Sequence, residues 1–411
     1  MERPLHDDEP PTSIEQFTVI YFGNDWFAEN RTSSHHVAEH LAQRTSVLYV
    51  DSPGLRAPKA RGRDVKKIGR VLASAMRAPR RVGDRLWHIS VPQIPFRRLP
   101  LVRRANSVIG RWLVKRAIAR LGLSRTISWF AVPHPGSLAN AFGETAVIYY
   151  CIDDYAALPD VDAHIVAELD AHLTACADQV FVASSRMLHA KASRPGIAMA
   201  RHGVDVALFR TAADPRLPVA AAARELPRPI VGFYGLIEDW IDLDLIADLA
   251  ERRPEWTFLM IGRLAVDAGR AGRRANVVFA GPKPYTDLPR WAKAFDVAIV
   301  PYRLTRQVVN AAPLKVREYL AAGRPVVSVP TPDTQRFAGL VHLASGCDQF
   351  LAAIDAAFRE DTLADRTRRM DAMAALSWDA RVAEVVAVVE DRIRHKVRGD
   401  KAQVDNHARV A

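Results

Sequence analysis

The sequence contains few cysteines and no long apolar run. Its 411 residues include three cysteines, Cys151, Cys176 and Cys347, which lie far apart and without the spacing of metal ligands. This favours a reduced, cytosolic setting over a disulfide framework. No apolar run approaches the roughly 18 residues that a membrane-spanning helix needs. The first fourteen residues are acidic and rich in proline, so we expect a disordered N-terminus and no signal peptide.

Several familiar motifs are also missing. The chain has no GxGxxG, GxxxxGK[ST] or GxSxG sequence, which argues against dinucleotide oxidoreductases, P-loop NTPases and serine hydrolases of the α/β type. Glycine and proline together contribute 47 residues, too few for a low-complexity or collagenous chain. With 49% hydrophobic and 25% charged residues, the composition is that of an ordinary globular protein.

Positive charge is abundant and lies mainly in one stretch. The formal net charge is +11, but residues 56–120 alone hold nineteen Lys and Arg against two acids, so that stretch carries +17 and the rest −6. Apolar residues such as Trp112 and Leu113 recur there at helical spacing, with Arg104 and Lys115 on other faces. Two interpretations stay open: surface helices with solvated basic faces, or a patch for an anionic membrane or a polyanionic substrate.

Short β-branched and aromatic runs alternate with helical patterns along the whole chain. The expected strands are 17–23, 46–50, 86–90, 126–130, 146–151 and 179–184, then 229–235, 256–262, 276–281, 296–301 and 325–330. Nearly continuous apolar strands separated by helices predict parallel sheets covered on both faces. These strands are too many for one sheet of usual size. We therefore predict an α/β protein with two Rossmann-like, doubly wound domains whose strand ends face a shared cleft.

Composition also suggests where the domains begin and end. Residues 210–229 hold four prolines and no strand pattern, which indicates a linker. The expected division is a disordered segment at 1–14, a first domain at 15–209, a linker at 210–228, a second domain at 229–377, a closing helix at 378–395 and a disordered tail at 396–411.

The strongest local signal is NAAPLKVREYLAAGRPVVSVP, residues 310–330. Pro313 suits the start of a helix and Gly323 suits its end. Free N–H groups at that start, with Lys315 in the first turn, form a site for an anion. Glu318 falls on the same face and could accept hydrogen bonds from ribose hydroxyls. The alternative is an exposed Lys315–Glu318 ion pair worth about 0.2–0.5 kcal/mol.

The run from Pro313 to Val327 resembles the nucleotide-sugar motif of GT-B glycosyltransferases, particularly family 4 and its relatives in exopolysaccharide and teichuronic acid synthesis. Other stretches resemble that family in the same order, namely YYCIDDY, RHGVDVALF (with His202 where Asn is usual), VGFYGLIEDWIDLDLI, AGPKPYTDLPRWAKAFD, DVAIVPY and the closing SWDARV helix, which in the family crosses back to the first domain. The resemblance covers most of residues 17–395.

The resemblance implies a nucleoside diphosphate sugar bound by the second domain and a carbohydrate or lipid-linked acceptor bound by the first, with no cofactor and no metal. The residues it assigns to the donor are Gly235, Gly262, Arg263, Pro313, Leu314, Lys315 and Glu318. Lys315 would contact the diphosphate and Glu318 the ribose. Many retaining members have a Glu at the position of Asn310, so inverting, glucuronosyltransferase-like relatives are an equally good comparison.

Inversion requires a general base near the acceptor hydroxyl. Asp153 and Asp154 follow the strand at 146–151, at the end where such sites form in parallel sheets. We expect one of the two, with Asp153 preferred, to face the cleft as the catalytic carboxylate. The alternative is a solvated or helix-capping acidic pair. A third acidic group, the DLD at 242–244, is best interpreted as a helix cap.

Polar residues also follow the first expected strand. Candidates there for contact with acceptor or donor are Asp25, Arg31, His35 and His36. Adjacent histidines do not share one helical face, so we expect no metal at this pair. Ser33 and Ser34 could simply cap the helix that follows.

These observations predict a metal-independent hexosyl- or glucuronosyl-transferase of polysaccharide biosynthesis. We expect it to be cytoplasmic and peripherally bound, through residues 56–120, to the anionic inner face of the membrane. Alternatives are a nucleotide-sugar epimerase of the same fold, a carbohydrate-binding member without turnover, or a polyanion- or nucleic-acid-binding protein. The basic stretch lacks a helix-turn-helix or RNA-binding signature, so we expect no nucleic acid as partner. The sugar, the base and the acceptor stay open.

Overall fold

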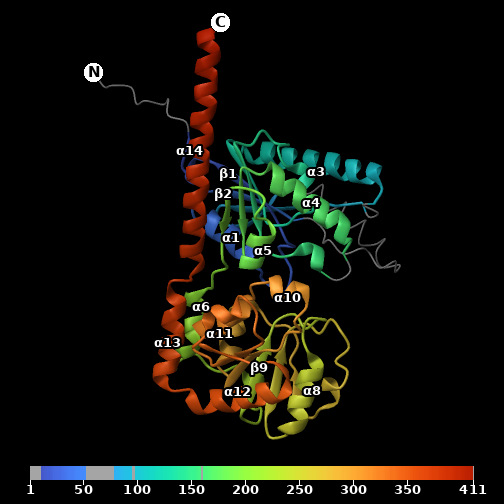
Figure 1. Ribbon diagram of the computed structural model, residues 1–411, viewed down its shortest axis with the longest axis vertical. Coiled ribbons are helices and arrows are strands. Elements are labelled where there is room, and N and C mark those ends of the chain that lie inside the picture. The colour runs from blue at the N-terminus through green and yellow to red at the C-terminus, as the bar shows by residue number, and fades with distance from the viewer. Residues whose placement is uncertain (1–10, 52–77, 95–97, 159–160, 411) are drawn as a thin grey trace, which may run out of the picture.

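The fold is built on two separate β-sheets, each with helices on both faces (Figure 1). A computed structural model describes residues 11–51, 78–94, 98–158 and 161–410. Residues 56–77 and 95–97 of the basic stretch lie outside these ranges, as do the first ten residues of the expected disordered N-terminus. Ser13 and Ile14, also expected to be disordered, are ordered by hydrogen bonds to the Glu390 carboxylate.

The first sheet has the strand order β3-β4-β2-β1-β5-β6-β7-β8. Its strands are β1 (Thr18–Gly23), β2 (Ser46–Asp51), β3 (Arg80–Gly83), β4 (Leu86–Ser90), β5 (Thr126–Phe130), β6 (Ala146–Cys151), β7 (Gln179–Val182) and β8 (Ile197–Met199). All neighbours are parallel except β3 and β4, which form an antiparallel hairpin at one edge. The sequence did not predict β3 and β8, because the first is polar and the second has three residues.

Alternate side chains of this sheet enter two different cores. Tyr21 and Trp129 belong to one buried cluster, whereas Phe22 and Phe130 belong to the other. The helices that cover the sheet are α1 (Ser33–Ala42), α3 (Pro100–Leu121), α4 (Ala163–Cys176) and α5 (Ser185–Ala190). Trp112 of α3, which the sequence placed in an apolar stripe with Leu113, is instead 52% exposed.

The second sheet is parallel throughout, with the order β11-β10-β9-β12-β13-β14. Its strands are β9 (Ile230–Tyr234), β10 (Thr257–Ile261), β11 (Val277–Phe279), β12 (Val297–Val300), β13 (Val326–Ser328) and β14 (Val341–Leu343). Its helices are α8 (Leu243–Arg252), α9 (Leu288–Ala292), α10 (Arg306–Asn310), α11 (Leu314–Ala321), α12 (Gly346–Glu360) and α13 (Leu363–Ala374). Asp242 caps α8 by accepting a hydrogen bond from the Leu245 N–H, as the sequence suggested.

The segment between the sheets holds two short helices, α6 (Val206–Arg210) and α7 (Ala221–Arg224), and no strand. The chain passes from one domain to the other at two neighbouring points. There the Val204 N–H donates to the Leu376 carbonyl at 2.9 Å, and the Trp378 N–H donates to the Val204 carbonyl at 3.2 Å. The two connections therefore lie side by side and form one hinge.

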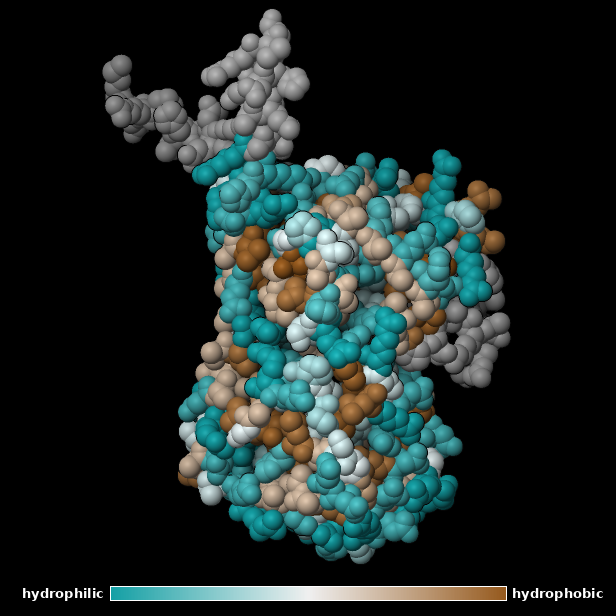
Figure 2. All heavy atoms as spheres, viewed as in Figure 1, coloured by the Kyte–Doolittle hydropathy of each residue, from teal (hydrophilic) through white to brown (hydrophobic). Residues whose placement is uncertain are grey.

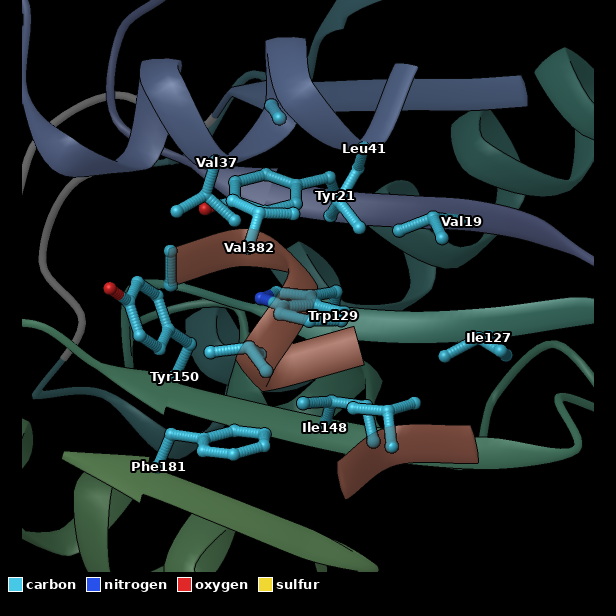
Figure 3. Close-up of a cluster of buried hydrophobic side chains, with 14 of the residues drawn as sticks. Val19, Tyr21, Val37, Leu41, Ile127, Trp129, Ile148, Tyr150, Phe181 and Val382 are labelled. Atoms are coloured by element: carbon cyan, nitrogen blue, oxygen red, sulfur yellow. The ribbon is translucent and has the colours of Figure 1, made fainter. Parts of the chain in front are cut away.

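The closing helix α14 (Trp378–Val410) crosses back and packs on the first domain, which confirms the expected fold (Figure 1). Trp378, Val382 and Val389 are buried in the same cluster as Tyr21 and Trp129. Figure 3 shows Val382 among the side chains of the sheet and of α1. The helix continues beyond its predicted end at 395, where the apolar stripe stops but several good helix formers follow.

Candidate functional site

Two glycines bring the loops after β9 and β10 into direct contact. Gly235 has φ +150° and Gly262 has φ +135°, conformations that side chains rarely adopt. A Cβ atom on Gly262 would lie 1.8 Å from the Gly235 carbonyl oxygen, and a Cβ on Gly235 would lie 3.2 Å from Cε of Lys315. The backbone of both loops is therefore bare at the carboxyl ends of the strands, and Lys315 lies directly beside it.

Lys315 and Glu318 form an enclosed pair rather than an exposed one. Lys315 Nζ lies 3.3 Å from Glu318 Oε2, and the side chains are 18% and 3% exposed. The ammonium group also lies 5.4 Å from the ring centre of Tyr234 on β9. Pro313 precedes the first residue of α11 as its N-cap, and Leu314 packs against the core of the first domain. The start of α11 thus places one cation and one carboxylate in the cleft.

A second ion pair fixes the start of α11 and was not predicted. Arg317 donates to both carboxylate oxygens of Asp333, at 2.9 and 2.8 Å, and to the Pro313 carbonyl at 3.1 Å. Arg317 and Asp333 are almost fully buried. Sixteen residues separate them, so helical spacing carried no signal for the pair.

On the first domain, His35 has a structural position. Its Nδ1 accepts from the Thr32 N–H at 3.1 Å, and its Nε2 contacts the Asp25 carbonyl at 2.9 Å. Burial lowers the pKa of His35 to about 4, so the ring is neutral and Nε2 carries the proton that it donates. The helix cap is Thr32, not Ser33 or Ser34 as the sequence suggested, because the His35 ring completes a capping box with Thr32.

His36 faces the second domain. Its ring stacks on Trp378 with centroids 5.0 Å apart and lies 5.2 Å from the ring of Tyr285. Its Nε2 is buried and has no hydrogen-bond partner among the described residues. Burial lowers the pKa of His36 well below its usual value, and the charges of Arg31 and Lys315 lower it further. His36 is therefore a buried, neutral ring packed between the first domain and Tyr285 of the second.

The other predicted residues of this region lie near the same opening. Asp25 is exposed, and Arg31 forms an ion pair with Glu39 inside the first domain. Arg263 reaches across the boundary instead, with Nε 3.4 Å from the Glu29 carboxylate of the first domain. Both groups of that pair are more than half exposed, so we expect it to break easily when a ligand arrives.

Asp153 and Asp154 have different surroundings. Asp154 Oδ2 accepts hydrogen bonds from Asn310 Nδ2 at 2.9 Å and from Arg306 Nε at 3.1 Å, both in α10 of the second domain. Asp153 Oδ1 accepts from the Asp154 N–H at 2.8 Å. Burial raises the pKa of Asp153 to about 7, and the negative charge of Asp154 adds to the increase. Asp153 can therefore exchange a proton near neutral pH, while Asp154 connects the domains.

A buried acid–histidine pair at the same sheet edge was missed. Asp51 ends β2, His88 lies on the adjacent β4, and Oδ2 of the acid is 2.7 Å from Nε2 of the ring. The side chains are 9% and 7% exposed. Asp51 directly follows the predicted strand 46–50, so the rule that drew attention to Asp153 could have found it.

Two features are absent from the described residues. Among residues 11–51, 78–94, 98–158 and 161–410, no group of three or more His, Cys, Asp and Glu side chains is arranged to hold a metal ion. In the same ranges, every helix is too short or too polar to cross a membrane.

Comparison with known sequences points to one enzyme family. Residues 228–360 match the sequence model of the family described as glycosyl transferases group 1. A teichuronic acid biosynthesis glycosyltransferase of Bacillus subtilis (strain 168), TuaH, is 27% identical over 230 residues. That match covers 52% of this chain and 57% of the relative, so the chain spans little more than half the length of the curated relative.

Solved structures agree over a longer part of the chain. Sucrose-phosphate synthase from Thermosynechococcus elongatus superposes with a TM-score of 0.67 at 15% identity, covering 91% of this chain and 98% of that one. An α,α-trehalose-phosphate synthase (UDP-forming) from Burkholderia vietnamiensis gives 0.62 at 15% identity, covering 94% and 99%. At such identities the likeness shows the fold, which is GT-B: two Rossmann-like domains that face a cleft.

Proposed function

We propose that this chain, whose second domain is that of a group 1 glycosyltransferase on a GT-B fold, transfers a sugar from a nucleoside diphosphate sugar to a carbohydrate or lipid-linked acceptor. One observation carries the proposal: a cation, a carboxylate and a bare backbone meet at the start of α11. Lys315, Glu318 and the loop at Gly235 make that arrangement.

Each chemical group of the donor has a partner in this arrangement. The diphosphate would lie at the N-terminus of α11, where free N–H groups and the Lys315 ammonium attract negative charge. Glu318 would accept hydrogen bonds from the ribose hydroxyls. Arg263, freed from Glu29, would reach the base or a phosphate. During transfer the bond from the sugar to the diphosphate breaks and the diphosphate keeps the electron pair, so these positive groups stabilise the developing charge. In this proposal that stabilisation needs no metal.

Asp153 is the proposed proton acceptor. The acceptor hydroxyl oxygen forms the new bond to the anomeric carbon, and its proton passes to a carboxylate in a single displacement that inverts the sugar. With its pKa raised to about 7, Asp153 is a far stronger base than an ordinary carboxylate. Asn310 cannot act as a carboxylate nucleophile, and its amide is bound to Asp154.

A nucleotide-binding experiment tests the proposal. We expect a panel of nucleoside diphosphates and their sugars to raise the melting temperature, because a ligand that binds the folded state stabilises it. Lys315→Met should abolish that increase and the turnover while keeping the fold. Lys396→Met is the matched control, because Lys396 lies on α14 and pairs with Asp178 far from the cleft. Nucleotide release that requires the acceptor would distinguish transfer from epimerisation, whereas stabilisation by no nucleotide would contradict the proposal.

The helix α3 supports a location at the inner face of the membrane. One side of α3 exposes three apolar side chains beside basic ones, and we name this the α3 surface: Leu101, Arg104, Val108, Arg111, Trp112 and Lys115. In Figure 2, hydrophobic and hydrophilic residues lie next to each other over the end of α3. Helix α3 holds six Lys and Arg and no acid, so anionic lipid headgroups suit its charge. The three cysteines are unpaired, which suits a cytoplasmic location.

A further inference from the structure

A groove lies between the domains beside the start of α11, and its wall includes none of the residues proposed for the donor. Ser184 and Arg186, after β7, line it from the first domain together with Arg201 near the hinge. Ala311, Asp333 and Arg336 line it from the second domain. The groove is small and partly open to solvent. Neither Lys315 nor Glu318 contributes to its walls.

The groove holds more positive charge than its own acid can neutralise. Arg186 and Arg201 have no ion pair or hydrogen bond with any described residue. Arg336 has a carboxylate oxygen of Asp333 at 3.7 Å. That carboxylate already accepts two hydrogen bonds from the buried Arg317. The groove therefore contains three guanidinium groups and one carboxylate, and that carboxylate is already bound by Arg317.

The arginines also affect each other. Burial lowers the pKa of Arg336, and the positive charge of Arg201 is the next largest contribution in the same direction. The proximity of these two positive charges costs free energy, and an anion between them would remove that cost. Val309, Ala311 and Pro332 line the groove as well, so part of its wall is apolar and strengthens charge interactions.

We infer that this groove binds a phosphate group. Guanidinium groups donate paired hydrogen bonds that match phosphate oxygens, and a phosphate dianion balances two of the three charges. The Ser184 hydroxyl accepts from the Met187 N–H at 3.3 Å, so its own proton is available to a further acceptor. The inference does not depend on sugar transfer. If the proposed function also holds, the phosphate can belong to the acceptor, because the first domain supplies two of the arginines.

Binding of inorganic phosphate to the full-length protein tests this inference. Titration calorimetry at constant ionic strength should show a site in the wild type, and Arg201→Gln and Arg336→Gln should each weaken it at least tenfold. Arg224→Gln is the control, since Arg224 is an exposed arginine of α7 that does not line the groove. No phosphate binding by the wild type, or an equal loss in the control, would overturn the inference.

A cross-test separates this site from the proposed donor site. Lys315→Met should keep phosphate binding, and Arg201→Gln should keep the stabilisation by nucleoside diphosphates. Loss of phosphate binding in Lys315→Met would mean that phosphate occupies the donor site, which overturns the inference. If transfer is found, competition identifies the source of the phosphate. If the groove holds a phosphate group of the acceptor, inorganic phosphate should raise KM for the acceptor and not for the donor. If it holds a free phosphate effector, the acceptor should not displace bound inorganic phosphate. Either result supports a phosphate site in the groove.

Discussion

The amide of Asn310 donates a hydrogen bond to the carboxylate of Asp154 across the domain boundary, over 2.9 Å. Asp154 follows β6 of the first sheet, and Asn310 ends α10, which follows β12 of the second. Arg306, one turn earlier in α10, donates to the same carboxylate oxygen. The ends of the two sheets are thus connected through one acid. Its neighbour Asp153 stays free of this connection.

Replacing Asn310 with aspartate should turn this attraction into repulsion. In Asn310→Asp, a second carboxylate would face Asp154 where an amide donated before. We expect the free energy of unfolding to fall by about 1–3 kcal/mol at pH 8. The loss should be smaller at pH 5, where one of two close carboxyl groups is more readily protonated. Denaturant unfolding at both pH values measures it.

A second substitution is the control for that experiment. Asp154→Asn in the Asn310→Asp background restores an amide facing a carboxylate, so it should recover part of the lost stability. A double-mutant cycle then gives the coupling between the two positions. Additive effects of the two substitutions would show that the hydrogen bond does not couple the domains in solution.

The pH dependence of turnover should follow Asp153. Because burial raises its pKa to about 7, kcat/KM should increase with pH through about 7, as the carboxyl loses the proton that blocks it as a base. Asp153→Asn should lower kcat by about 10²–10⁴-fold, the usual contribution of a general base. Asp84→Asn, in the exposed turn between β3 and β4, should leave kcat and the pH profile of kcat/KM unchanged. A profile without a group near pH 7 would contradict the assignment.

The stability contribution of Asp153 should decrease with pH, whereas turnover should increase. In the folded protein the pKa of Asp153 is raised from its ordinary 3.8 to about 7, so the folded state keeps a proton that the unfolded chain has released. Its contribution to the free energy of unfolding therefore falls as pH rises from about 4 to about 7 and stays low above that. Asp153→Asn removes this loss. The free energy of unfolding of the variant, minus that of the wild type, should therefore be larger at pH 8 than at pH 4, although the variant is inactive. An equal stability difference at both pH values would show that the pKa is not raised.

The contact between Gly262 and Gly235 should tolerate no side chain. Gly262→Ala places a methyl group 1.8 Å from the Gly235 carbonyl oxygen, so the loops must separate. We expect a loss of more than about 3 kcal/mol in unfolding free energy and no stabilisation by nucleotides. Gly269→Ala is the matched control, because Gly269 has φ +55° with nothing within 4 Å of its added Cβ, and should cost only about 1 kcal/mol. Similar losses in both variants would mean that the loops do not touch.

Local patterns in the sequence were enough to predict the central strands of both sheets and the position of Lys315 and Glu318 at the start of a helix, but not the edge strands β3, β8 and β14. Apolar runs identify buried strands, and the carboxyl ends of parallel strands must meet at one edge. The sequence could not predict the partners of Asp154 or Arg317, because those contacts join residues that only the tertiary fold brings together. Periodicity likewise defines the faces of α3 but not which face is covered, so Trp112 was assigned to the wrong side.

The α3 surface should bind anionic lipid through charge and apolar contact together. Sedimentation with phosphatidylglycerol vesicles at low salt should carry the wild type down, and phosphatidylcholine vesicles should not. Each basic residue near such a surface contributes about 1 kcal/mol, so Arg104→Gln with Arg111→Gln should weaken binding about 30-fold. Trp112→Ser should weaken it at high salt as well, since burial of the indole does not depend on screening. Arg216→Gln, in the segment between the two sheets, is the control for loss of an exposed charge. Undiminished binding of the double variant would exclude α3 as the contact, since both arginines are exposed among its apolar side chains.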